Sequence, residues 1–150
     1  MYIHQIYFNY DEYWDDLWQQ SMESWNDISG TQYKLWNEAD IYEIVKEYPK
    51  IKSLWDKLKY PVQKIDLGRF VLIYHFGGLY ADLDVVNEDA SLSYIDKDHF
   101  LTACKVLETD IIYYKNPKHP HFKNFFSYLD KNLEEVNSKE IYKIWGARYI

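Results

Sequence analysis

Hydrophobic positions along the chain follow two periods that alternate with each other. Short runs rich in β-branched and aromatic residues are typical of strands, whereas hydrophobic residues three and four positions apart are typical of helices that bury one face. The strand-like runs lie at 2–8, 31–36, 79–86, 99–107 and 110–115. The helix-like stretches lie at 11–25, 38–49, 50–60, 62–76 and 119–133. Strands that alternate with helices predict an α/β layered domain with a mostly parallel sheet.

Local signals mark the ends of the helix at 62–76. Pro61 is a favourable first helical residue, and the pair Gly77 and Gly78 is typical of a helix end. In the first helix the hydrophobic spacing predicts an inward face, formed by Trp14, Leu17, Trp18, Met22 and Trp25. No low-complexity tract, repeat or linker divides the chain, so its 150 residues predict a single domain over 1–150.

Charge and cysteine content exclude several classes of protein. The formal net charge of −7 argues against a nucleic-acid partner, and an anionic ligand would need a metal ion or a local cationic patch. The one cysteine, Cys104, excludes an internal disulfide framework and a cysteine-based zinc site, and we expect it to be a small core residue. Because no apolar stretch reaches the roughly 20 residues of a membrane span and no signal-peptide pattern opens the chain, we expect a soluble, cytoplasmic protein.

The stretch GGLYADLDVV at 77–86 joins two acidic residues to a hydrophobic strand pattern. Strand alternation would place Tyr80, Asp82 and Asp84 on one face, opposite Leu79, Ala81, Leu83 and Val85. Two carboxylates at the end of a buried strand repel each other, and a divalent cation such as Mg²⁺ or Mn²⁺ would relieve that repulsion. A bare D-x-D is more often a turn cap next to a solvated carboxylate, so the motif needs its context.

The preceding helix supplies part of that context. Asp66 and Arg69 are three residues apart and therefore share a helix face, where they could bind hydroxyl groups and a diphosphate or form an exposed ion pair. Gly68 costs the helix about 1 kcal/mol relative to alanine, which indicates close packing or close approach of a ligand. Gly77 and Gly78 would let the backbone turn sharply and approach a ligand.

The string IDLGRFVLIYHFGGLYADLDVV at 65–86 resembles the D-x-x-R…G-G-x-Y-x-D-x-D signature of DXD-motif glycosyltransferases. These are glycosyltransferase family 32 and related sugar transferases, including the glucosyltransferase domains of large clostridial toxins. IHQIYF at 3–8, YKLWNEADI at 33–41 and NPKHPHFKNFF at 116–126 resemble other family stretches in the same order. The resemblance covers about residues 2–127.

The resemblance implies a GT-A fold, a Rossmann-like α/β/α layered domain. It implies transfer of a sugar, with retention of configuration, from a UDP- or GDP-sugar to a glycan, protein or lipid-linked acceptor, assisted by Mn²⁺ or Mg²⁺. Carried over residue by residue, Asp84 is the direct metal ligand and Asp82 contacts the donor ribose and the metal shell. Asp66 and Arg69 hold the donor sugar and its diphosphate, and these four residues are the expected catalytic set.

Other residues are expected around the donor. The resemblance places Gln5, Ile6 and Tyr7 at the strand end that borders the base, and makes Tyr80 a packing residue. Trp36 and Asn37, directly after the second strand, are equally well explained as pocket or as structural residues. Of the five histidines, His4 is expected in the core and His75 to pack or cap a helix, whereas a cap or loop role is expected for His119 and His121.

Alternatives remain open from sequence alone. ADLDVV also fits the start of a haloacid-dehalogenase-type phosphatase, but no D-D or G-D-x-x-x-D follows to complete that site. An EF-hand is excluded because Val86 stands at a ligand position. The resemblance implies a C-terminal part that we expect 1–150 to lack, which leaves a nucleotide-sugar binding module with little or no turnover as the main alternative to a working transferase.

Overall fold

The computed structural model describes residues 1–10, 12–89, 91–93, 95, 98–102 and 110–136. Its centre is a sheet with the strand order β2-β1-β3-β5-β4. The strands are β1 (Tyr2–Ile6), β2 (Gln32–Trp36), β3 (Gly78–Ala81), β4 (His99–Thr102) and β5 (Ile111–Tyr114). β1 pairs in parallel with β2 and β3, whereas β5 pairs antiparallel with β3 and β4. All strands except β5 therefore share one direction, which confirms the mostly parallel sheet.

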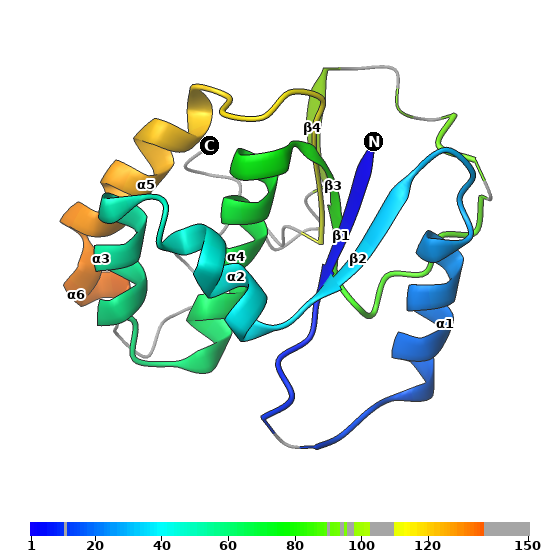
Figure 1. The fold of residues 1–150 in the computed structure, drawn as a ribbon, viewed down its shortest axis with the longest axis horizontal. Helices are drawn as coiled ribbons and strands as arrows, with labels where there is room; N and C mark the ends of the chain where they lie inside the picture. The colour runs from blue at the N-terminus through cyan, green and yellow to red at the C-terminus, as the bar shows by residue number, and fades with distance from the viewer. Residues whose placement is uncertain (11, 90, 94, 96–97, 103–109, 137–150) are drawn as a thin grey trace.

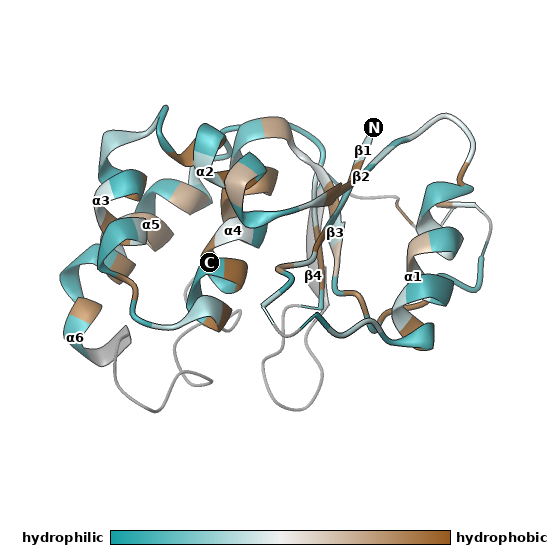
Figure 2. Ribbon diagram, turned by 60° about the horizontal axis from the view of Figure 1, so that its bottom comes forward, coloured by the Kyte–Doolittle hydropathy of each residue, from teal (hydrophilic) through white to brown (hydrophobic). Residues whose placement is uncertain are grey.

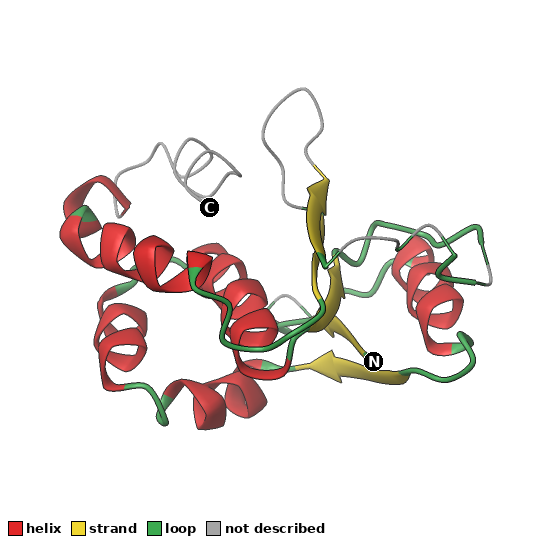
Figure 3. Cartoon of the chain, turned by 90° about the horizontal axis from the view of Figure 1, so that it is seen from above, coloured by secondary structure: helices red, strands yellow, loops and turns green. Residues whose placement is uncertain are grey.

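Helices cover both faces of this sheet (Figures 1 and 3). One face carries α1 (Asp16–Asn26), and the remaining described helices lie on the other side. These are α2 (Glu38–Val45), α3 (Pro49–Lys57), α4 (Pro61–Phe76), α5 (His121–Lys131) and α6 (Leu133–Val136). The predicted α/β/α layering is thus confirmed. Among the described helices, none has the length and apolar character that crossing a bilayer requires.

Two hydrophobic cores separate the layers. The larger one lies between the sheet and α2–α5, and includes Ile6, Tyr80 and the inward face of α4. The smaller one joins Ile3, Leu79 and Trp25 beneath α1. Figure 2 shows hydrophobic segments along the sheet and between the helices, with hydrophilic outer turns.

The predicted inward face of the first helix is confirmed only in part, since Trp25 is buried but Trp14, Trp18 and Met22 are only partly buried. α1 begins only at Asp16, since Asp15 caps it by accepting a hydrogen bond from the Leu17 backbone, and Leu17 is 41% exposed. The residues that α1 buries are Ser21 and Trp25, four positions apart on one face. The later part of the predicted strand at 99–107, together with Cys104, lies outside the described residues.

His4 is a buried core residue, as predicted, and its hydrogen bonds define its tautomer. The Trp36 indole N–H lies 3.1 Å from His4 Nδ1, which must accept, so His4 Nε2 carries the proton and donates to the Gly77 carbonyl oxygen at 2.9 Å. Burial lowers the pKa of His4 to about 4, although its bond to Gly77 opposes that shift. The ring is therefore neutral at pH 7.

This neutral histidine makes stability depend on pH. Its folded pKa lies below the unfolded value of 6.5, so the unfolded chain binds the proton more readily. The contribution is fully present above about pH 6.5 and is lost, by up to about 3 kcal/mol, as pH falls towards 4. We expect the difference in free energy of unfolding between wild type and His4→Gln to shrink between pH 7.5 and 4.5, measured by urea denaturation. An equal difference at both pH values would contradict this assignment.

Candidate functional site

The two acidic residues of the D-x-D stretch lie on a turn directly after β3. The strand prediction for 79–86 is correct only to Ala81, where alternation holds: Tyr80 faces the α4 side, and Leu79 and Ala81 face α1. Beyond it, the Val85 backbone N–H donates to the Asp82 carbonyl oxygen at 3.1 Å and closes a turn. The Asp82 N–H still donates to the Asp110 carbonyl oxygen beside β5, but the Asp82 and Val85 carbonyls accept from side chains of β1 and α1.

Asp82 is held from two sides. Its Oδ1 accepts a hydrogen bond from the Tyr80 hydroxyl at 2.5 Å and lies 3.5 Å from Arg69 Nη1. Burial raises the pKa of Asp82 to about 6; Arg69 and the Tyr80 bond oppose this rise, whereas Asp110 and Asp84 add to it. The site therefore holds an excess of carboxylates, and an added cation would be attracted to it.

Arg69 is the centre of the site. It forms an ion pair with Asp66, and their side chains are only 11% and 13% exposed, so the alternative of an exposed ion pair is wrong. The guanidinium also lies over the Tyr80 ring, 5.4 Å from its centroid. Burial raises the pKa of Asp66, and the charge of Arg69 counteracts that rise. Arg69 thus links the two carboxylates of Asp66 and Asp82.

Asp84 is arranged differently. Its side chain is exposed, and among the described residues its carboxylate takes part in no hydrogen bond or ion pair. No cluster of three or more His, Cys, Asp or Glu side chains suited to a metal occurs in the described part of the chain. Two carboxylates fit a cation such as Mg²⁺, which usually takes one or two protein carboxylates and completes its shell with water and phosphate oxygens.

The three residues predicted to border the base, Gln5, Ile6 and Tyr7, have different surroundings in the structure. Gln5 is fully buried, and its amide binds Ser21, Tyr33 and the Asp82 carbonyl. Ile6 is a core residue, so its side chain is not available to a base. Tyr7 is partly exposed at the carboxyl end of β1, and its hydroxyl donates to the Tyr13 carbonyl at 2.5 Å.

Trp36 and Asn37 have structural roles here. Trp36 is 6% exposed and binds His4 in the core, so it does not offer a free ring to a base. Asn37 caps α2 by accepting a hydrogen bond from the Asp40 backbone at 2.9 Å. These contacts favour the structural interpretation of both residues, and a role in the donor pocket stays a prediction.

The glycines are explained by close backbone packing, which accounts for Gly77 and Gly78 without a ligand; a Cβ on Gly77 would lie 3.1 Å from the Tyr114 carbonyl oxygen. Gly78 has φ +91°, and a Cβ there would lie 2.4 Å from the Tyr2 carbonyl oxygen. It begins β3, about 13 Å from Asp82 at the usual rise of a strand. A Cβ on Gly68 would lie 3.2 Å from Ile41 and 3.3 Å from Ile6, which explains this glycine by close packing.

Sequence reasoning missed two features beside the turn. Trp14 and Trp18 lie edge-on or tilted to Tyr7, with ring centroids 4.9 and 5.8 Å away, and form a partly exposed aromatic group at the carboxyl end of β1. Ser21 and Trp25 both bind the Val85 carbonyl. A polar residue four positions before a tryptophan on the inward face of α1 was the signal for this pair.

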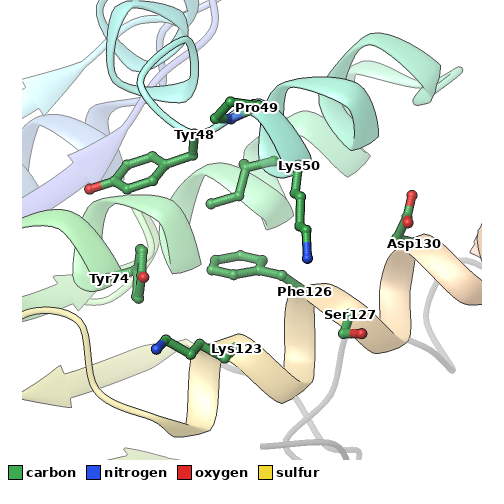
Figure 4. Close-up of a pocket in the computed structure, with 9 residues that line it drawn as sticks. Tyr48, Pro49, Lys50, Tyr74, Lys123, Phe126, Ser127 and Asp130 are labelled. Atoms are coloured by element: carbon green, nitrogen blue, oxygen red, sulfur yellow. The ribbon is translucent and has the colours of Figure 1, made fainter.

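A separate cavity of about 470 Å³ lies between α3, α4 and α5 (Figure 4). The rings of Tyr48, Tyr74 and Phe126 line it together with Lys50 and Lys123, and none of the predicted site residues does so. Tyr74 follows Asp66 by eight residues on α4, about 12 Å along the helix. His75 packs as predicted and binds the Tyr48 hydroxyl at 2.7 Å. His119 and His121 lie at the start of α5, beside Tyr114.

The arrangement matches a known family. The model of the glycosyltransferase sugar-binding region containing a DXD motif matches residues 15–104, more than half of the chain. The chain belongs to this family. The matched range includes the Asp82–Asp84 turn, and the sequence resemblance to DXD glycosyltransferases is confirmed.

Relatives and a solved structure agree with this family. A mannosyl phosphorylinositol ceramide synthase of Saccharomyces cerevisiae is 35% identical over 55% of the chain and 22% of the relative. Inositol phosphoceramide mannosyltransferase 1 of Schizosaccharomyces pombe is 28% identical over 91% of the chain and 43% of the relative. PaToxG glycosyltransferase matches the fold with a TM-score of 0.69 at 12% identity, over 97% of this chain and 64% of that one. The GT-A fold is thus confirmed, and the chain spans less than half the length of these two relatives.

Proposed function

We propose that this DXD domain transfers a hexosyl group from a nucleotide-diphosphate sugar, with help from a divalent cation. The observation that carries the proposal is the grouping of Arg69 with Asp66 and Asp82 next to the exposed carboxylate of Asp84. The Arg69 guanidinium is held between the partly buried carboxylates of Asp66 and Asp82, beside the exposed carboxylate of Asp84. This arrangement suits a ligand that brings phosphate oxygens, hydroxyl groups and a metal together.

The chain's own groups have distinct tasks in this proposal. Departure of a nucleoside diphosphate builds negative charge on its oxygens, and a bound Mn²⁺ or Mg²⁺ would supply Lewis-acid stabilisation of that charge. Asp84 would be its direct ligand, with Asp82 next to it. Arg69 supplies a second, preorganised positive charge, and Asp66 offers an acceptor to sugar hydroxyls. The aromatic group of Tyr7, Trp14 and Trp18 offers ring faces to the base.

Mannose is our first candidate for the transferred sugar, because both yeast relatives are named for mannosyl transfer. Their names also favour a lipid-linked acceptor over a glycan or protein. We propose either UDP or GDP as the carrier and retention of anomeric configuration. That the protein has no nucleic-acid partner, as its net charge of −7 suggests, stays a prediction, and so does a cytoplasmic location.

The proposal is tested by incubating the purified chain with UDP- and GDP-linked glucose, galactose and mannose. We expect slow release of nucleoside diphosphate and free sugar from one donor with Mn²⁺ or Mg²⁺, measured by chromatography, and none with EDTA. Proton NMR of the first free sugar formed gives its anomeric configuration. If no donor releases nucleoside diphosphate and free sugar, the proposed transferase activity is overturned. Binding of a nucleotide without release would instead support a binding module, which the partial coverage of the relatives keeps as the second candidate.

A further inference from the structure

The metal-ligating aspartate we assign lies on a turn that is held by residues outside the DXD motif. We propose that three buried residues, Gln5, Ser21 and Trp25, form a turn brace that fixes the Asp82–Val85 backbone and so sets where the Asp84 carboxylate meets the cation. This inference rests on the proposed function for the identity of the cation site. The hydrogen bonds of the brace are independent of it.

One end of the turn is held from β1. The Asp82 carbonyl oxygen accepts from the Gln5 side-chain amide at 3.2 Å as well as from the Val85 N–H. Gln5 cannot easily rotate away, because the Tyr33 hydroxyl donates to its Oε1 at 2.9 Å and its amide also donates to Ser21 Oγ at 2.9 Å. Its orientation is therefore fixed at both polar atoms.

The other end of the turn is held from α1. The Val85 carbonyl oxygen accepts from Ser21 Oγ at 2.6 Å and from the Trp25 indole N–H at 2.8 Å. Ser21 is 0% exposed and Trp25 is 1% exposed, so water does not compete for these bonds. Figure 1 shows the segment after β3 running beside α1. The carbonyls on both sides of Asp84 are thus bound by buried side chains.

This geometry matters because Asp84 has no side-chain partner of its own among the described residues. Within the described part of the chain, only the backbone fixes the position of this carboxylate. Groups that orient a metal ligand without touching the metal often control metal affinity as strongly as the ligand's own geometry does. The three brace residues are therefore positioning residues for the cation, not ligands.

The test compares wild type with Ser21→Ala. This change removes the hydrogen bond that Ser21 donates to the Val85 carbonyl and the one that it accepts from the Gln5 amide. Mn²⁺ binding is measured by electron paramagnetic resonance, with UDP and with GDP present in turn. Because one hydrogen bond is worth about 1 kcal/mol, we expect the apparent Mn²⁺ dissociation constant to rise about fivefold. Hydrogen exchange of the Val85 amide should quicken, whereas that of Tyr80 within β3 should not. Ile44→Val, in the other core, is the control for a comparable loss of stability.

Each outcome decides a different claim. A weaker Mn²⁺ affinity and faster Val85 exchange in Ser21→Ala, but not in Ile44→Val, support the brace. If wild type binds Mn²⁺ with a nucleotide and Ser21→Ala behaves identically in both measurements, the brace is overturned and the proposed function stands. If wild type shows no Mn²⁺-dependent nucleotide binding, the proposed function falls, and the metal-positioning role falls with it.

Discussion

Replacing Asp84 with asparagine is expected to slow metal-dependent donor hydrolysis by about 100-fold or more, because the direct carboxylate ligand of the cation is lost. The fold should be unaffected, since the Asp84 side chain is exposed and makes no hydrogen bond or ion pair within the described residues. Its removal also relieves repulsion on Asp82. The rate of nucleotide release and the melting temperature are the two measurements.

Glu88→Gln is the matched control, because Glu88 is an exposed acid downstream of the same turn. It removes the same charge from the surface but no proposed ligand, so we expect nearly wild-type rates. An Asp84→Asn protein that keeps more than a tenth of the wild-type rate would remove Asp84 from the metal site.

Replacing Arg69 with methionine is expected to have the largest effect on stability. It leaves Asp66 and Asp82 in a mostly buried site without their shared counter-charge, a change that typically costs about 3–5 kcal/mol. Both carboxylates should then titrate at higher pH, so the loss should be smaller at pH 5 than at pH 7.5. Urea denaturation at the two pH values measures this, and donor hydrolysis should be lost as well.

Lys64→Met supplies the comparison for Arg69→Met. Lys64 pairs with Glu38 at 3.0 Å, but their side chains are 28% and 35% exposed. A pair so open to solvent is worth less than about 1 kcal/mol. Equal losses in the two variants would mean that Arg69 is no more than a surface ion pair. Combining Arg69→Met with Asp66→Asn should recover part of the lost stability, because one uncompensated charge is then absent.

The sequence predicts best where local rules decide the structure. The helix at 62–76 is found as α4 from Pro61 to Phe76, since a proline at its start and a glycine pair at its end fix its bounds. The shared face of Asp66 and Arg69 follows from helix geometry alone. The burial of these two side chains cannot be predicted in this way, because it depends on contacts with Tyr80 of β3 and Asp82 of the turn that follows.

The remaining differences depend on partners that are distant in sequence. The turn after β3 is held by Gln5, Ser21 and Trp25, none of which a local strand pattern could indicate. Gly78 needs its glycine because the Tyr2 carbonyl lies against it, and that contact exists only once β1 and β3 are paired. Trp36 lies in the core, where its indole N–H donates a hydrogen bond to the buried His4 ring.

The proposal that Asp84 holds a divalent cation for a nucleotide is best tested by calorimetric titration of the chain with UDP and with GDP. The titration is run with Mn²⁺ and with EDTA, on wild type and on Asp84→Asn. We predict that one nucleotide binds wild type only when Mn²⁺ is present, and that Asp84→Asn loses this binding. Nucleotide binding that is unchanged by EDTA and by Asp84→Asn would contradict the proposal.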